Sequence, residues 1–294
     1  MTEAEGRKAV RDTKAAGYSF VKIYNNLTLE AYEAIMDEAE RLGIEVVGHL
    51  PNCINSDYTG QQRSYTIRQK TIEHLVFLHH GNIDAAIQAE VWLCPTFTVE
   101  QNMRHGPSPE AEGALGELRP LIDSLYWKAL SGQHTKPREG IQRTVRHDDL
   151  YHDQCFRRFR EQGGRVLLGT DAGLPGVIPG FSLHQELACA VDHGMSPLEV
   201  LQCVTLGAAQ FMGLDDERGS IQPGKRAELL VVQGNPLDDI RNTRKIFALQ
   251  KGSHFWTAQG LRDIRRKAFN RPELAVDTVF RRYMLQTPIR AIKG

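Results

Sequence analysis

Residues 19–49 read SFVKIYNNLTLEAYEAIMDEAERLGIEVVGH, and this stretch decides the fold class. Residues 19–24 and 44–49 are short runs rich in aromatic and β-branched residues, which is typical of strands. Between them Thr28 is a good helix N-cap, apolar residues follow at helical spacing, and Gly43 supplies the C-terminal stop. Strand, helix and strand within about 30 residues is the unit of a parallel sheet. The sequence therefore predicts an α/β protein.

The same alternation continues along the chain. Strands are predicted at 70–74, 91–95 and 163–171, with a helix at 82–89. Residues 97–160 break the rhythm, because this mostly polar, helix-forming stretch is far longer than an ordinary connection between a strand and a helix. We expect a helical insertion there.

Two helices with clear start signals are predicted after the last of these strands. Ser182 and Ser196 each open a capping-box pattern, and the two helices should stop at Gly194 and Gly213. From 218 to about 251, short apolar runs alternate with Gly/Pro turns. This pattern predicts a small β element outside the helical layer.

Composition excludes several classes of partner. The chain has 294 residues with 36 basic and 36 acidic side chains, so its net charge of zero offers no electrostatic footprint for nucleic acid or an anionic membrane. No stretch approaches about 18 uncharged apolar residues, and the first residues form a charged helix pattern, so we expect neither a membrane span nor a signal peptide. Five scattered cysteines favour a reducing, cytoplasmic location. A small-molecule substrate is the expected partner.

Four polar residues end, or nearly end, predicted parallel strands: Lys22, His49, His74 and Asp171. Functional sites of parallel βα folds are built where strands have their carboxyl ends. Two imidazoles and a carboxylate suit Zn²⁺ and similar ions, so the four residues outline a hydrolytic metal site. Structural roles remain open for each: a hydrogen-bonded core histidine, an outward-pointing Lys22, or a turn opened by Asp171.

The motifs around these residues resemble a known family. FVKIY (20–24), VVGHLP (46–51), TIEHL (71–75), LLGTDAG (167–173) and the run from MSPLEVLQCVTLGAAQF to QGNPLDDI (195–240) are similar to the amidohydrolase superfamily. Within it, they resemble the imidazolonepropionase-like and Xaa-Pro-dipeptidase-like branch. The resemblance covers roughly residues 10–250, and the closing run is its most specific part.

The resemblance implies a role for each residue. Lys22 would be the strand-four lysine, which in such enzymes is often carboxylated and bridges two metals, and His49 and His74 would be the ligands of strands five and six. Asp171 would be the strand-eight ligand and the catalytic general base. The implied reaction is hydrolysis of a C–N bond in an amide, cyclic amide or dipeptide by water activated on one or two divalent ions, with zinc the expected metal. A mononuclear site of His49, His74 and Asp171 is the alternative.

The family's HxH motif on strand one is missing from this sequence. We therefore expect a partial (β/α)8 barrel with strands four to eight over residues 1–216, including the insertion at about 97–160. A β-sandwich remnant should follow over 217–252 and a helical tail over 253–294.

A barrel without three strands has two unpaired edges, which a soluble monomer does not tolerate. The chain is thus expected to be a truncated enzyme, or to be completed by its own insertion or tail, by another chain or by homo-oligomerisation. The alternative function is a catalytically inactive remnant or interaction module that retains part of the metal site.

Overall fold

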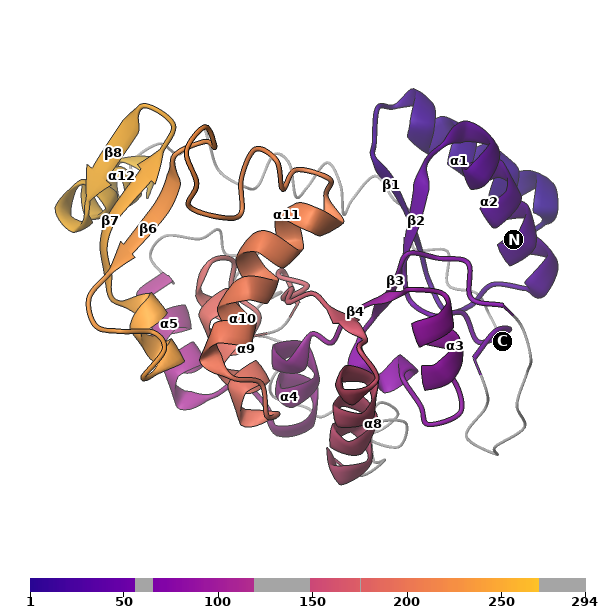
Figure 1. The fold of residues 1–294 in the computed structure, drawn as a ribbon, viewed down its shortest axis with the longest axis horizontal. Coiled ribbons are helices and arrows are strands. Elements are labelled where there is room, and N and C mark those ends of the chain that lie inside the picture. Colours follow the sequence, from indigo (N-terminus) through magenta and orange to yellow (C-terminus); the bar gives the residue numbers. More distant parts are fainter. Residues whose placement is uncertain (56–65, 119–148, 175, 270–294) are drawn as a thin grey trace.

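The computed structural model describes residues 1–55, 66–118, 149–174 and 176–269. The α/β prediction is confirmed, because parallel strands alternate with helices and a small antiparallel sheet follows (Figure 1). The elements up to the middle of the chain are α1 (Glu3–Ala15), β1 (Phe20–Ile23), α2 (Leu29–Leu42), β2 (Glu45–Gly48), β3 (Thr71–Glu73), η1 (Leu75–Phe77), α3 (Ile83–Gln88), β4 (Trp92–Cys94), α4 (Phe97–His105) and α5 (Pro109–Leu118). The later elements are α8 (Asp149–Glu161), β5 (Arg165–Val166), α9 (Phe181–Asp192), α10 (Pro197–Gln202), η3 (Cys203–Gly207), α11 (Ala208–Phe211), β6 (Glu228–Val232), η4 (Ile240–Arg244), β7 (Ile246–Lys251), β8 (His254–Thr257) and α12 (Ala258–Phe269).

The five parallel strands follow one another in chain order. β1 pairs with β2, and β3 pairs with β4, which pairs with β5. β2 and β3 are linked without a regular ladder: the Lys70 amide donates to the Val46 carbonyl at 2.7 Å, and the Gly48 amide donates to Thr71 Oγ1 at 2.9 Å. All five carboxyl ends therefore lie at the same edge.

Local signals near the N-terminus act as predicted. Thr28 caps α2 by accepting a hydrogen bond from the Ala31 amide, and Gly43 ends the helix in the left-handed conformation. α1 and α2 lie side by side next to β1 and β2 (Figure 1). Tyr32 on α2 is completely buried in the hydrophobic core that also holds Ile72 and Leu93 of the sheet.

Aromatic side chains fill the amino-terminal part of the sheet's other face. Phe211 of α11 stacks on Phe20 of β1 with 5.6 Å between the ring centroids, and it meets Trp92 of β4 edge to face at 5.7 Å. The ammonium of Lys70 lies 4.8 Å from the centroid of Phe211. α11 therefore covers the amino-terminal ends of the strands with apolar side chains, and the polar side chains lie at the carboxyl ends.

Several expected boundaries are corrected. Ser196 forms its capping box, but α9 begins at Phe181 after Gly180, and Ser182 lies inside its first turn, where its hydroxyl accepts from the Ile178 amide. The strand predicted at 163–171 is only β5, because its ladder with β4 is limited to Arg165 and Val166; Asp171 lies beyond it with a φ of 48°.

The predicted insertion and tail are described only in part. α8 directly precedes β5, and residues 119–148 lie outside the described residues, so the insertion at about 97–160 stays a prediction. The predicted helical tail begins with a strand, because β8 pairs with β7 and extends the small sheet to Thr257 before α12. The predicted domain limits at 216 and 252 stay predictions.

In the part of the chain that the structure describes, no strand pairs with the outer edge of β1 or of β5. Also within that part, no helix is both long enough and apolar enough to cross a membrane.

β1 and β2 approach each other so closely at Gly48 that a side chain there would collide with the neighbouring strand. The φ of Gly48 is 126°, and a Cβ atom there would lie 2.2 Å from the Ile23 carbonyl oxygen, whereas a Cβ at Gly43 (φ 60°) would meet nothing within 4 Å. We expect Gly48→Ala to lower the free energy of unfolding by about 3 kcal/mol or more, and Gly43→Ala by about 1 kcal/mol. Urea unfolding of both variants measures the difference, and equal losses would contradict the close approach.

Candidate active site

Lys22 lies on β1 and points toward the carboxyl end of β3. Its Nζ atom is 2.7 Å from Glu73 Oε2. Burial disfavours the ammonium, but the hydrogen bond to Glu73 and the negative charges of Glu73 and Asp171 outweigh it, so the pKa of Lys22 is raised. Carboxylation requires the neutral amine, and in this arrangement Glu73 stabilises the charged form.

His49 follows β2 and is surrounded by rings. Its ring centroid lies 4.5 Å from that of Tyr24, 5.0 Å from that of Phe77 and 4.7 Å from that of His74, which it meets edge to face. Burial, together with the nearby His74 and Lys22, lowers the pKa of His49 to about 4. Its Nδ1 atom is buried without a hydrogen-bond partner in the described structure. His49 is therefore a neutral imidazole with an unused ring nitrogen.

His74 is held from one side and faces a carboxylate on the other. Nδ1 lies 2.6 Å from Thr96 Oγ1, and Nε2 lies 3.9 Å from Asp171 Oδ2. Burial lowers the pKa of His74, although the charges of Asp171 and Glu73 oppose the shift. With Nδ1 engaged by Thr96, Nε2 is the nitrogen directed at Asp171.

Three of these residues have unusual backbone angles: φ is 72° at His74, 52° at Thr96 and 48° at Asp171. Such left-handed conformations are uncommon outside glycine and cluster at functional sites. Regular strand alternation would send Glu73 and His74 to opposite faces. Because the strand ends between them, both side chains reach the same site.

The structure thus brings together all four residues that the sequence predicts: Lys22, His49, His74 and Asp171. It also adds Glu73 and Thr96, which sequence reasoning missed. A carboxylate in the otherwise buried strand β3 was a usable signal for Glu73, whereas nothing in the sequence pointed to Thr96. The side chains of Lys22 and Asp171 are 38% and 37% exposed, so the site opens to solvent.

The donor chemistry fits a divalent ion. His49 and His74 are neutral because of burial, one of them has an orphaned nitrogen, and Asp171 supplies a facing carboxylate. Within the described residues, however, no three His, Cys, Asp or Glu side chains are arranged to hold a metal. The pair His74–Asp171 is the part of such a set that the structure arranges.

Other histidines among the described residues lie away from the four predicted site residues. His184 joins α9 to η4 through a 3.0 Å contact between Nδ1 and Thr243 Oγ1. His105 and His152 line a separate cavity of about 250 Å³. His134 and His147 lie outside the described residues.

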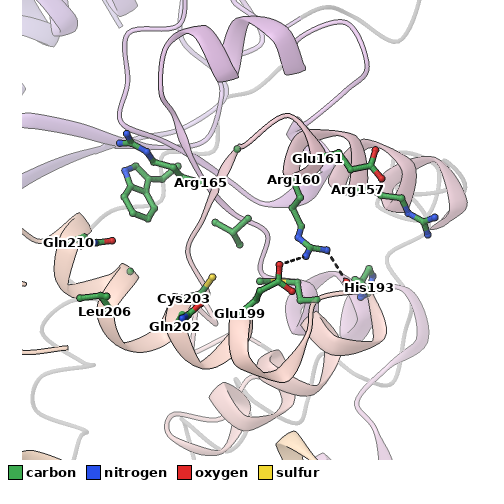
Figure 2. A pocket seen from close by; sticks show the side chains of 16 residues that line it. Arg157, Arg160, Glu161, Arg165, His193, Glu199, Gln202, Cys203, Leu206 and Gln210 are labelled. Carbon is green, nitrogen blue, oxygen red and sulfur yellow. Dashed lines mark hydrogen bonds and ion pairs between the residues drawn. The ribbon is translucent and has the colours of Figure 1, made fainter. Parts of the chain in front are cut away.

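A cavity of about 830 Å³ lies at the opposite end of the strands (Figure 2). Trp92 and Arg165, the first residues of β4 and β5, contribute to its wall. Arg160 reaches across to donate to Glu199 Oε1 and to the Gly194 carbonyl, both at 2.9 Å. None of the four predicted site residues lines this cavity, so it is distinct from the candidate active site.

Comparison with known proteins places the chain in a family. The model of the amidohydrolase family matches residues 4–254. The chain belongs to the amidohydrolase family.

Local similarity to curated proteins is limited in extent. Imidazolonepropionase of Deinococcus deserti is 40% identical over 88 residues, which are 30% of this chain and 22% of that protein. Adenine deaminase of Ligilactobacillus salivarius is 34% identical over 68 residues, which are 23% of this chain and 12% of that protein. These matches cover less than a quarter of each relative.

Solved structures share the fold over most of this chain. A Xaa-Pro dipeptidase with bound methionine in its active site superposes with a TM-score of 0.64 at 21% identity, covering 88% of this chain and 59% of that one. A bottromycin amidohydrolase superposes with a TM-score of 0.63 at 21% identity, covering 91% and 62%. The chain therefore spans about three fifths of the length of these structures.

The low pKa of His49 predicts an acid-sensitive native state. Below about pH 6.5 an unfolded chain binds a proton on this imidazole, whereas the folded protein does so only near pH 4, so stability falls as the pH drops through this window. Between about pH 7.5 and pH 5, we expect the metal-free protein to lose on the order of 2 kcal/mol more stability than His49→Asn. Urea titrations at the two pH values measure this difference.

His254→Asn is the matched control, because it removes an exposed histidine on β8. Its pH dependence should equal that of the unaltered protein. A loss of stability in His49→Asn as large as in the unaltered protein would contradict burial of a neutral His49.

Proposed function

We propose that this chain carries part of the active site of a metal-dependent hydrolase of C–N bonds, acting on an amide, a cyclic amide or a dipeptide. The observation that carries the proposal is the convergence of His49, His74 and Asp171 at the carboxyl ends of three strands, with Nε2 of His74 facing Asp171 at 3.9 Å. The names of its relatives, an imidazolonepropionase and a Xaa-Pro dipeptidase, support this class of bond.

His49, His74 and Asp171 would hold the ion, and zinc suits two neutral imidazoles and a carboxylate. When bound, such an ion polarises a carbonyl oxygen and makes water nucleophilic near neutral pH. The roles of the chain's own residues follow from their surroundings. Asp171 is exposed enough to receive a proton from water and pass it to the leaving nitrogen, and buried His74 keeps its lone pair because burial opposes protonation.

Lys22 has two possible roles in this proposal. Carboxylated, it would bridge two ions; as the ammonium paired with Glu73, it leaves a mononuclear site of His49, His74 and Asp171. The 2.7 Å ion pair supports the mononuclear form.

We also propose that β1–β5 are strands four to eight of a (β/α)8 barrel, and that further strands complete it. The unpaired outer edges of β1 and β5 in the described structure support this proposal, as does coverage of about three fifths of the solved relatives. Those strands would come from a longer form of the chain, from a second copy or from another protein. The five free cysteines support a cytoplasmic location.

A catalytically silent role is the second candidate. The described residues hold no ready three-ligand set, and Lys22 is engaged by Glu73, as would be expected of a remnant that serves as an interaction module. Metal content separates the two candidates.

Elemental analysis of the purified protein after zinc loading and dialysis tests metal binding. We expect bound zinc in the unaltered protein and at least tenfold weaker zinc binding in His74→Asn. Mutation of a residue that only supports a metal ligand already lowers metal affinity by about 10-fold or more, and loss of the ligand itself should cost at least as much. His254→Asn should bind zinc normally. Absence of Zn, Mn, Co and Fe from the metal-replete unaltered protein would exclude the hydrolase proposal.

Hydrolysis of a panel containing an imidazolone, a Xaa-Pro dipeptide and an N-acyl amide tests the chemistry. Asp171→Asn should lower kcat by about 10²- to 10⁴-fold, the usual contribution of a general base. Asp84→Asn, which alters an exposed carboxylate paired with Arg158, is the control and should keep full activity. Equal rates for the two variants would exclude Asp171 as the base.

A further inference from the structure

Thr96 is placed to cap a helix but does not do so. It occupies the N-cap position of α4, where a threonine hydroxyl ordinarily accepts a hydrogen bond from an amide of the first turn. Here its backbone is left-handed, with φ 52° and ψ 49°, and its side chain makes no capping bond. The hydroxyl instead lies 2.6 Å from His74 Nδ1.

The missing cap is supplied by Glu186, which lies on a different helix, α9. The Phe97 amide donates to its Oε1 at 2.9 Å, and the Thr98 amide and hydroxyl both donate to its Oε2 at 2.8 Å. A carboxylate at a helix N-terminus also interacts favourably with the helix dipole. Glu186 therefore satisfies the first turn of α4 in place of Thr96.

Capping α4 with Glu186 requires burial of a carboxylate, which a threonine cap would avoid. Glu186 is 0% exposed, and burial raises its pKa to about 7 against the hydrogen bonds from Thr98 and Phe97. A threonine in an ordinary capping conformation would satisfy the same turn with a local, neutral hydroxyl. What the buried carboxylate adds is freedom for the Thr96 hydroxyl to contact His74.

The same helix also follows Asp171 in the chain. α9 begins ten residues after Asp171, so it connects the loop that carries this carboxylate to the start of α4. A second contact ties α4 to the segment after His74, since the Val76 amide donates to Glu100 Oε1 at 2.9 Å. α4 is thus tied both to α9 and to the segment that follows His74.

We infer that Glu186 is a positioning residue for the proposed active site: by capping α4 from α9, it holds the Thr96 hydroxyl where it accepts a hydrogen bond from His74 Nδ1–H. The lone pair of His74 then lies on Nε2, facing Asp171. The assignment of His74 as a reacting-site ligand rests on the proposed function, whereas the control of its tautomer by Glu186 does not. Partners of this kind fix the tautomer and ring orientation of a functional histidine.

Nuclear magnetic resonance of the ring nitrogens tests the inference in the metal-free protein, without requiring activity. At about pH 8, where imidazoles are neutral, His74 should show the signature of a single tautomer protonated on Nδ1. Glu186→Gln places amide hydrogens against the donors of α4, so the first turn should shift and His74 should change to a mixture of tautomers. Thr96→Val should produce the same loss directly.

Glu38→Gln is the matched control, because Glu38 on α2 is also buried, at 4% exposure, but pairs with Arg11 and Arg41 away from the site. It should leave the His74 signals unchanged. Folded Glu186→Gln protein with unchanged His74 signals would overturn the inference.

If Glu186→Gln does not fold, Thr98→Val gives a milder version of the same test. It removes one of the three hydrogen bonds to Glu186 and leaves both amide donors in place. A partial shift of the His74 signals toward the mixture supports the inference, and unchanged signals contradict it. Because neither result depends on zinc or on hydrolysis, the inference and the proposed function can fail separately.

Discussion

Parallel pairing of five short strands is the constraint on which the rest of this structure depends. Because the strands run in the same direction, Lys22 near the end of β1 and the residues that follow β2, β3 and β5 meet at one edge although they are far apart in the chain. Close approach of β1 and β2 at Gly48 sets the position of His49, whose amide donates to the Ile23 carbonyl at 3.1 Å. The aromatic layer around Phe211 occupies the opposite end of the strands. Polar chemistry is thereby confined to the carboxyl ends.

Burial gives the site its chemical character. Two imidazoles that are held neutral by burial lie beside a carboxylate that remains open to solvent. The imidazoles are therefore suited to bind a metal ion, and the carboxylate is suited to exchange protons with water. The backbone adds strain at the same place, since His74, Thr96 and Asp171 all have positive φ. Such conformations persist only where surrounding contacts hold them. Here those contacts include the hydrogen bonds from α4 to Glu186.

Much of this arrangement could be predicted from local sequence. Thr28 and Gly43 bound α2, and Lys22, His49, His74 and Asp171 were predictable because each ends an apolar strand run. Ser182 shows the limit: its spacing fits a capping box, but its hydroxyl bonds the Ile178 amide, and Gly180 takes the cap position. Thr96 and Glu186 were not predictable. The contact of Thr96 with His74 is not local in sequence, and the hydrogen bond from Thr98 to Glu186 spans 88 positions and depends on how α4 packs against α9. The brevity of β5 likewise reflects its short pairing with β4, which is limited to Arg165 and Val166 and which periodicity does not show.

In the proposed site, His49 and His74 share one metal ion with Asp171. X-ray absorption at the zinc edge of the zinc-loaded protein tests it most directly, because imidazole rings give a characteristic outer-shell scattering signal. We expect two imidazoles in the unaltered protein and one in His49→Asn, with His254→Asn identical to the unaltered protein. Zinc scattering without imidazole, or a signal that the His49 substitution leaves unchanged, would contradict it.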